Sequence, residues 1–160
     1  TAATYPDTEA LVDVPSGRRW TYAELDAEID TVAKALMASG LEQGDRVGIW
    51  APNCPEWTVL QYATAKIGAI LVTINPAYRT HELAYGLQHS GVRLLVSAVD
   101  FKMSDYRAMV AEARSDVPEL AEVLFLGTED GVSARGRAGW TTWPQTLPRI
   151  RPGIRLRFAV

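Results

Sequence analysis

Short apolar runs and amphipathic stretches alternate along the first 126 residues of the chain. An apolar run of four to six residues is typical of a strand that is buried on both faces of a parallel sheet. Such runs occur at 47–50, 69–74 and 123–126, and the segment 93–96, with three apolar residues after Arg93, is expected to be a further strand. The segments between them are long enough to return each strand parallel to the last. The pattern therefore predicts an α/β fold, with a mainly parallel sheet and helices on both of its faces.

Helix signals fill the three crossovers. Pro55 suits the first turn of a helix over about 56–67, and Gly68 stops it. Thr80 is expected to cap a helix that ends at Ser90-Gly91. A third helix is expected from about Asp100, because Met103, Tyr106, Val110 and Ala113 recur at helical spacing until Val117-Pro118 forbids continuation.

A hairpin and a helix are expected to precede the sheet. The segments 10–14 and 18–21 read as two short strands joined by a Pro-Ser-Gly turn. Thr21 and Glu24 have the spacing of a capping box, so a helix is expected to open at Thr21. Its apolar positions step by four, three and four along one face, and Gly40 ends it.

Composition narrows the class of protein. The 160 residues are 48% hydrophobic and 22% charged, which is ordinary for a globular domain. No apolar run approaches a membrane span, the first residues do not resemble a signal peptide, and the single Cys54 can form no internal disulfide. We therefore expect a cytoplasmic protein.

The charges are unevenly distributed. Residues 1–126 carry 17 acidic and 10 basic side chains, whereas residues 127–160 carry 2 acidic and 6 basic ones. The acidic body argues against a nucleic-acid partner, because a phosphate backbone requires clustered Lys and Arg. We expect residues 1–126 to form one subdomain and 127–160 a basic, irregular tail. This tail is either a solvated end or a contact for phosphates or anionic lipid.

A series of short motifs follows one another along the chain. It starts with Trp20-Thr21-Tyr22-Ala23-Glu24-Leu25, Gly44-Asp45-Arg46-Val47 and Ala51-Pro52-Asn53. It continues through Ala65-Lys66-Ile67-Gly68-Ala69-Ile70, Ile74-Asn75-Pro76-Ala77-Tyr78-Arg79 and His89-Ser90-Gly91-Val92-Arg93. The order of these motifs resembles the acyl-CoA synthetase branch of the adenylate-forming, AMP-binding ligase superfamily. No single motif is diagnostic, but their order is specific over roughly Glu9 to Leu126. The tail departs from the acidic linker that is usual in the family.

The resemblance implies an enzyme that activates a carboxylic acid with ATP and Mg2+ to an acyl-adenylate and then transfers the acyl group to coenzyme A. In the family this chemistry uses a Ser/Thr/Gly-rich loop ending in Pro-Lys, an aromatic-Gly-x-Thr-Glu motif, an Asp that holds the ribose and a lysine of a carboxy-terminal domain. None of these motifs occurs in the 160 residues. The chain is therefore expected to be an amino-terminal fragment, with no catalytic residue, no bound cofactor and negligible adenylation on its own.

Five residues are candidates for contacts with ligands. Asn75, Pro76 and Tyr78 follow a predicted parallel strand, where open α/β sheets place ligands, and are candidates for the acyl site. Asn-Pro is also a common strand terminator, so turn formation is the competing interpretation. Arg79 resembles a basic position that reaches coenzyme A phosphates in some relatives, or it is an exposed arginine at a helix start. Asn53 either faces a substrate or caps the helix at Pro55.

Other reactive side chains have plainer interpretations. His81 and His89 lack partners at metal-ligand spacing and are expected at the surface. Cys54 near a helix start is either a thiol of lowered pKa or a small buried residue. Trp20, Trp50 and Trp57 are expected to pack in the core.

Three functions remain open from the sequence. The first is a piece of a medium- or long-chain fatty-acid CoA ligase, whose missing downstream half is its main partner. The second is a stand-alone binding or interaction module that has lost catalysis. The third, a flavodoxin-like nucleotide binder, lacks the Gly-rich turns that phosphate binding uses. A fragment would also expose apolar surface, so self-association is expected.

Overall fold

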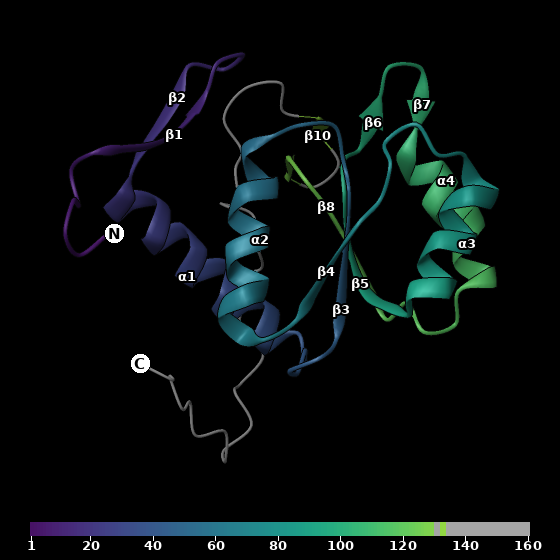
Figure 1. Cartoon of the computed structure of the whole chain (residues 1–160). Coiled ribbons are helices and arrows are strands. Elements are labelled where there is room, and N and C mark those ends of the chain that lie inside the picture. The colour runs from purple at the N-terminus through teal and green to yellow at the C-terminus, as the bar shows by residue number, and fades with distance from the viewer. Residues whose placement is uncertain (130–131, 134–160) are drawn as a thin grey trace.

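The computed structural model describes residues 1–129 and 132–133, and Figure 1 shows the arrangement of the elements. Four strands form one sheet in the order β4-β3-β5-β8, and every neighbouring pair is parallel. They are β3 (Arg46–Trp50), β4 (Ile70–Thr73), β5 (Val92–Ser97) and β8 (Glu122–Phe125). The predicted parallel sheet is confirmed.

Helices cover both faces of this sheet, as the sequence predicts. Figure 1 shows α1 and α2 on one face and α3 and α4 on the other. The helices span Tyr22–Ala38 (α1), Pro55–Ile67 (α2), Thr80–Ser90 (α3) and Tyr106–Ala113 (α4), and a 3-10 turn, η1 (Arg114–Asp116), follows α4. Within the described ranges, no helix is long and apolar enough to cross a membrane.

Two apolar cores lie on the two faces of the sheet. Val47 and Ile49 of β3 pack toward α1 and α2, whereas Trp50 belongs to the core under α3 and α4. Leu94 and Leu95 of β5 divide between the two cores in the same way. Because strand side chains alternate between faces, a strand that is buried on both faces must be apolar at successive positions. This requirement explains the continuous runs of the two central strands, β3 and β5.

The amino-terminal hairpin is antiparallel and consists of β1 (Glu9–Asp13) and β2 (Arg18–Thr21). The predicted capping box follows it at the start of α1. The Thr21 hydroxyl accepts a hydrogen bond from the Glu24 backbone N–H (3.3 Å), and the Glu24 carboxylate accepts one from the Thr21 backbone N–H (2.8 Å). These bonds fix the first turn of α1 and confirm the predicted helix start.

The helix expected from Asp100 is wrong over its first six residues. The chain forms a small antiparallel hairpin of β6 (Asp100–Phe101) and β7 (Ser104–Asp105), and α4 begins only at Tyr106. Lys102 turns the hairpin with a positive φ of 56°, and Met103 is fully exposed. The helical spacing of Met103 is therefore a coincidence, while Tyr106, Val110 and Ala113 are buried as expected.

Two expected caps are also wrong. Residue Arg79, and not Thr80, is the N-cap of α3, and the Glu82 carboxylate accepts a hydrogen bond from its backbone N–H (2.8 Å). Cys54 is the N-cap of α2, which has no side-chain cap, so Asn53 does not cap this helix.

Beyond Gly127, the residues described form a short antiparallel pair, β9 (Thr128–Glu129) with β10 (Val132–Ser133). The rest of the predicted tail lies outside the described residues.

Candidate functional site

The sheet order places a topological switch point between β3 and β5. The chain leaves β3 for α2 on one face and leaves β5 for α4 on the other face (Figure 1). In open α/β sheets, ligands bind outside the carboxyl ends of the strands at such a point. The candidate site therefore comprises the loops that follow β3, β4 and β5. The predicted residues come from the first two of these loops.

Asn53 lies in the loop after β3, next to the switch point, and its side chain is exposed. Trp57 of α2 holds this loop, because its indole Nε1–H donates to the carbonyl oxygens of Ala51 (3.2 Å) and Pro52 (3.1 Å). Within the described part of the chain, the Asn53 amide makes no side-chain hydrogen bond. Its two polar ends are thus free to meet a polar ligand group.

Asn75 forms a turn in the loop after β4. Its side-chain Oδ1 accepts a hydrogen bond from the Ala77 backbone N–H (2.9 Å), and its carbonyl oxygen accepts one from the Tyr78 backbone N–H (3.0 Å). This is the Asx-turn pattern, in which the side chain mimics a backbone turn. The turn interpretation of Asn75 is therefore confirmed. Its side-chain amide nitrogen makes no hydrogen bond within the described residues.

Two buried aromatic residues attach this loop to the body of the protein. Trp50, the last residue of β3, donates its indole Nε1–H to the Asn75 carbonyl oxygen (3.0 Å), and the Tyr106 hydroxyl donates to the Pro76 carbonyl oxygen. The two rings stack, with centroids 3.6 Å apart and planes at 5°. Burial raises the pKa of Tyr106 to about 12, so its hydroxyl keeps the donated proton. From the sequence, both residues read only as core positions.

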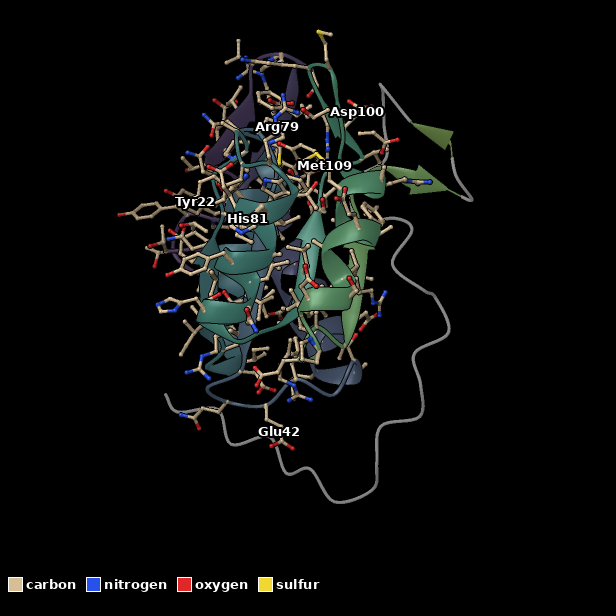
Figure 2. All side chains as sticks on the ribbon, turned by 90° about the vertical axis from the view of Figure 1, so that its right-hand side faces the viewer. Tyr22, Glu42, Arg79, His81, Asp100 and Met109 are labelled. Carbon is tan, nitrogen blue, oxygen red and sulfur yellow. The ribbon has the colours of Figure 1, made fainter. Side chains whose placement is uncertain are left out.

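Tyr78 and Arg79 end the loop. Tyr78 is half-buried and packs against the core under α3 and α4. Arg79 is exposed, and its guanidinium Nη1 donates to the Ser104 hydroxyl in β7 (3.0 Å). Figure 2 shows Arg79 and Asp100 at one end of the molecule and Glu42 at the opposite end. Asn75, Pro76, Tyr78 and Arg79 thus share one loop, while Asn53 occupies the neighbouring one.

These residues do not fit an ATP–Mg2+ complex. Within residues 1–129 and 132–133, no group of three or more His, Cys, Asp or Glu side chains is placed to hold a metal ion. Among the five predicted site residues only Arg79 is cationic, and an exposed guanidinium is suited to bind one phosphate group.

His81 and His89 are exposed on α3, where His89 stacks on Tyr85 (5.4 Å between centroids). Both are surface residues, as expected.

Cys54 behaves as a buried thiol. Burial raises the pKa of Cys54 to about 12, and the neighbouring Glu56 carboxylate adds to this effect. The nearby start of α2 does not offset this burial, so the alternative of a lowered pKa is wrong. Cys54 is consequently no candidate for a nucleophile at neutral pH.

Comparisons with known proteins agree on one family. A family model described as "AMP-binding enzyme" matches residues 1–149. The matched range extends past Leu126, so the boundary between subdomain and tail stays a prediction. The medium-chain acyl-CoA ligase ACSF2, mitochondrial, of Danio rerio is 42% identical over 112 residues, which is 70% of this chain and 18% of that protein.

Solved structures share the fold. The N-terminal domain of FACL13 from Mycobacterium tuberculosis superimposes with a TM-score of 0.70 at 27% identity, over 78% of this chain and 31% of that one. A fatty acyl CoA synthetase from the same organism gives a TM-score of 0.70 at 28% identity, over 78% of this chain and 24% of that one. The chain thus spans only about a fifth of the length of the curated relatives that it matches.

Proposed function

Because the chain belongs to the AMP-binding enzyme family, we propose that it is the amino-terminal part of an ATP-dependent acyl-CoA ligase. The observation that carries this proposal is the superposition of 78% of the chain on 31% of the N-terminal domain of FACL13. The segment supplies a folded scaffold and one set of loops. The groups that bind and activate the nucleotide belong to the remainder of the ligase.

The substrate that we propose is a medium- or long-chain fatty acid. The relatives named above are a medium-chain acyl-CoA ligase and a fatty acyl CoA synthetase, which supports a hydrophobic acid. The reaction joins the carboxylate to AMP with release of pyrophosphate, and the thiol of coenzyme A then displaces AMP. ATP, Mg2+ and coenzyme A are the reactants that such a ligase requires.

In this ligase, the two loops at the carboxyl edge form part of the substrate site. Asn53 offers a free amide, and Asn75, Pro76 and Tyr78 present a rigid turn that forms a wall for the acyl group. Arg79 is assigned to a phosphate of coenzyme A, since its guanidinium is exposed and, within the described residues, forms one side-chain hydrogen bond, to Ser104. No residue of the chain is assigned a catalytic role.

The isolated chain is expected to be inactive. Stabilising the charge that moves to pyrophosphate requires preorganised cationic and backbone donors, and the described residues gather no such group. The measurement is ATP–pyrophosphate exchange with purified chain, Mg2+ and a C8 to C16 fatty acid. We expect the no-enzyme rate, and exchange clearly above that rate would contradict this assignment.

A longer polypeptide provides the positive arm of this test. The reading frame after codon 160 is cloned together with the present segment, and the same exchange is measured. Fatty-acid-dependent exchange in the long form alone supports the proposal. No exchange in a folded long form would favour a binding module that has lost catalysis.

A further inference from the structure

Two consecutive carbonyl groups in the loop 74–79 receive hydrogen bonds from one aromatic pair. The Asn75 carbonyl oxygen accepts from Trp50 Nε1, and the Pro76 carbonyl oxygen accepts from the Tyr106 hydroxyl. The donors come from the end of β3 and from the first residue of α4. The loop is thereby attached to β3, one of the two strands at the switch point, and to α4, which follows the other strand, β5, in the chain.

The geometry of the pair makes these two bonds interdependent. Both side chains have 0% exposure, and the rings stack almost in parallel. Phe101 of β6 closes the group, with its ring edge toward Tyr106 at 6.5 Å between centroids. Neither ring can rotate without displacing the other, so each donor is held toward its carbonyl group. Loss of the Tyr106 hydroxyl removes the hydrogen bond to the Pro76 carbonyl oxygen, and loss of the Trp50 indole N–H leaves the Asn75 carbonyl oxygen with only its bond from the Tyr78 backbone N–H within the described residues.

A third contact holds the far end of the loop. Arg79 reaches Ser104, which lies two residues before Tyr106 in the same hairpin–helix junction. The segment Ser104–Tyr106 therefore contacts the loop at two places that are three residues apart. This arrangement fixes the turn at Asn75 and the direction of the chain from that turn to Arg79.

We propose that Trp50 and Tyr106 are positioning residues that fix the loop 74–79, and with it Asn75, Pro76 and Arg79, at the carboxyl edge of the sheet. The attachment itself follows from the contacts, whereas its consequence for acyl and coenzyme A binding rests on the proposed function. Neither residue touches the substrate. They act through the two carbonyl groups of the loop.

Amide hydrogen exchange of the chain, followed by NMR, tests the attachment. Tyr106→Phe removes one hydroxyl, and Trp50→Phe removes the indole N–H while keeping an aromatic ring. The amides to follow are those of Ala77 and Tyr78, which are bonded within the turn. Trp57→Phe is a matched control, because it removes an indole N–H that holds the loop after β3. Tyr62→Phe removes an exposed hydroxyl on α2.

Each substitution of the pair is expected to speed exchange at Ala77 and Tyr78 by roughly two- to tenfold, the range that one lost hydrogen bond gives. Sheet amides such as that of Leu95 should change less than the loop amides, and the two controls should leave the loop unchanged. Tyr106→Phe makes the smaller change in the core. If Trp50→Phe unfolds the chain, the exchange rates of the Tyr106→Phe variant test the proposal. Loop exchange at the original rate, or acceleration spread equally over the sheet, would overturn the proposal.

The same variants in the long polypeptide test the functional consequence. We expect KM for the fatty acid or for coenzyme A to rise about three- to tenfold, with a smaller change in kcat, because a loosened loop weakens binding. A released loop with unchanged kinetics would refute a positioning role. If the unsubstituted long form lacks ligase activity, the proposed function fails, while the exchange data still decide whether the pair holds the loop.

Discussion

Cys54 shows how one side chain can be chemically silent although it lies beside the candidate site. It follows Asn53 and precedes the first residue of α2. A thiol at a helix start can have a lowered pKa. In the folded chain, however, burial raises the pKa of Cys54 from its ordinary value of 9.0 to about 12. The thiolate is the reactive form, so its population decides the reactivity.

Alkylation by iodoacetamide at pH 8 should therefore be slow in the folded chain. A pKa raised by about three units lowers the thiolate fraction about a thousandfold, and the greater nucleophilicity of the more basic thiolate recovers part of this. A net decrease of at least about thirtyfold, relative to the urea-unfolded chain, is expected by mass spectrometry. The control is Cys54→Ser combined with Ser39→Cys, whose thiol is exposed. Equal rates for Cys54 and this control would contradict the prediction.

Asn75 and Trp50 show which contacts of single residues can be predicted from the sequence and which cannot. The turn at Asn75 depends on its neighbours at most three residues away, and the sequence predicts it correctly. The hydrogen bond from Trp50 to Asn75 joins residues 25 positions apart, and that from Tyr106 to Pro76 joins residues 30 positions apart. Such contacts depend on the packing of β3 and α4, which no local pattern encodes.

At the scale of elements, the boundaries of α4 show where a periodic pattern misleads. Met103 fits the helical spacing of Tyr106 and Val110, yet it lies in the turn between β6 and β7. The local signal that ends the hairpin is Asp105, whose side-chain carboxylate accepts a hydrogen bond from the Ala108 backbone N–H (3.0 Å). Cap chemistry decides the first residue of the helix here, whereas apolar spacing only locates its buried face.

Substitution of this cap measures its contribution. Asp105→Ala leaves an orphan N–H in the first turn of α4 and should lower the free energy of unfolding by about 1 kcal/mol, whereas Asp105→Ser should retain most of it. Urea unfolding followed by circular dichroism is the measurement. Asp100→Ala is the control, because Asp100 pairs with Asp105 across the hairpin but caps no helix. An equal loss in this control would assign the effect to the hairpin.

The strands were predictable for a different physical reason. β3 and β5 lie in the middle of the sheet with helices on both faces, so their burial requires continuous apolar runs that few other structures need. Helix ends at Gly68 and Gly91 were predictable because both residues adopt the left-handed conformation that closes a helix. The pairing order of the strands was not, since it depends on crossovers that the sequence leaves unspecified.

In the whole molecule, β4 and β8 are the two edge strands of the four-stranded sheet. On β4, Ile70 is 49% exposed, and on α2 Tyr62 is 53% exposed. An apolar edge strand of this kind is a template for pairing with another chain. In a ligase, the remainder of the protein would cover such surface.

We therefore expect the isolated chain to self-associate at micromolar concentration. Static light scattering should give a mass above the 17.5 kDa of one chain. Ile70→Lys should restore the single-chain mass, because a charge on an edge strand opposes pairing. Val14→Lys, at the tip of the amino-terminal hairpin, is the control and should have no effect. A compact monomer of the unsubstituted chain would contradict this expectation.

The four parallel strands follow one another within residues 46–125, and each is joined to the next by a crossover with one α-helix, the last of which also contains the β6–β7 hairpin and η1. All four strands and the helices that connect them therefore come from one continuous segment of the chain. During translation, at about 5–20 residues per second, it can assemble once Phe125 has emerged from the ribosome. In a longer polypeptide, the later segments would then meet a surface that has already folded.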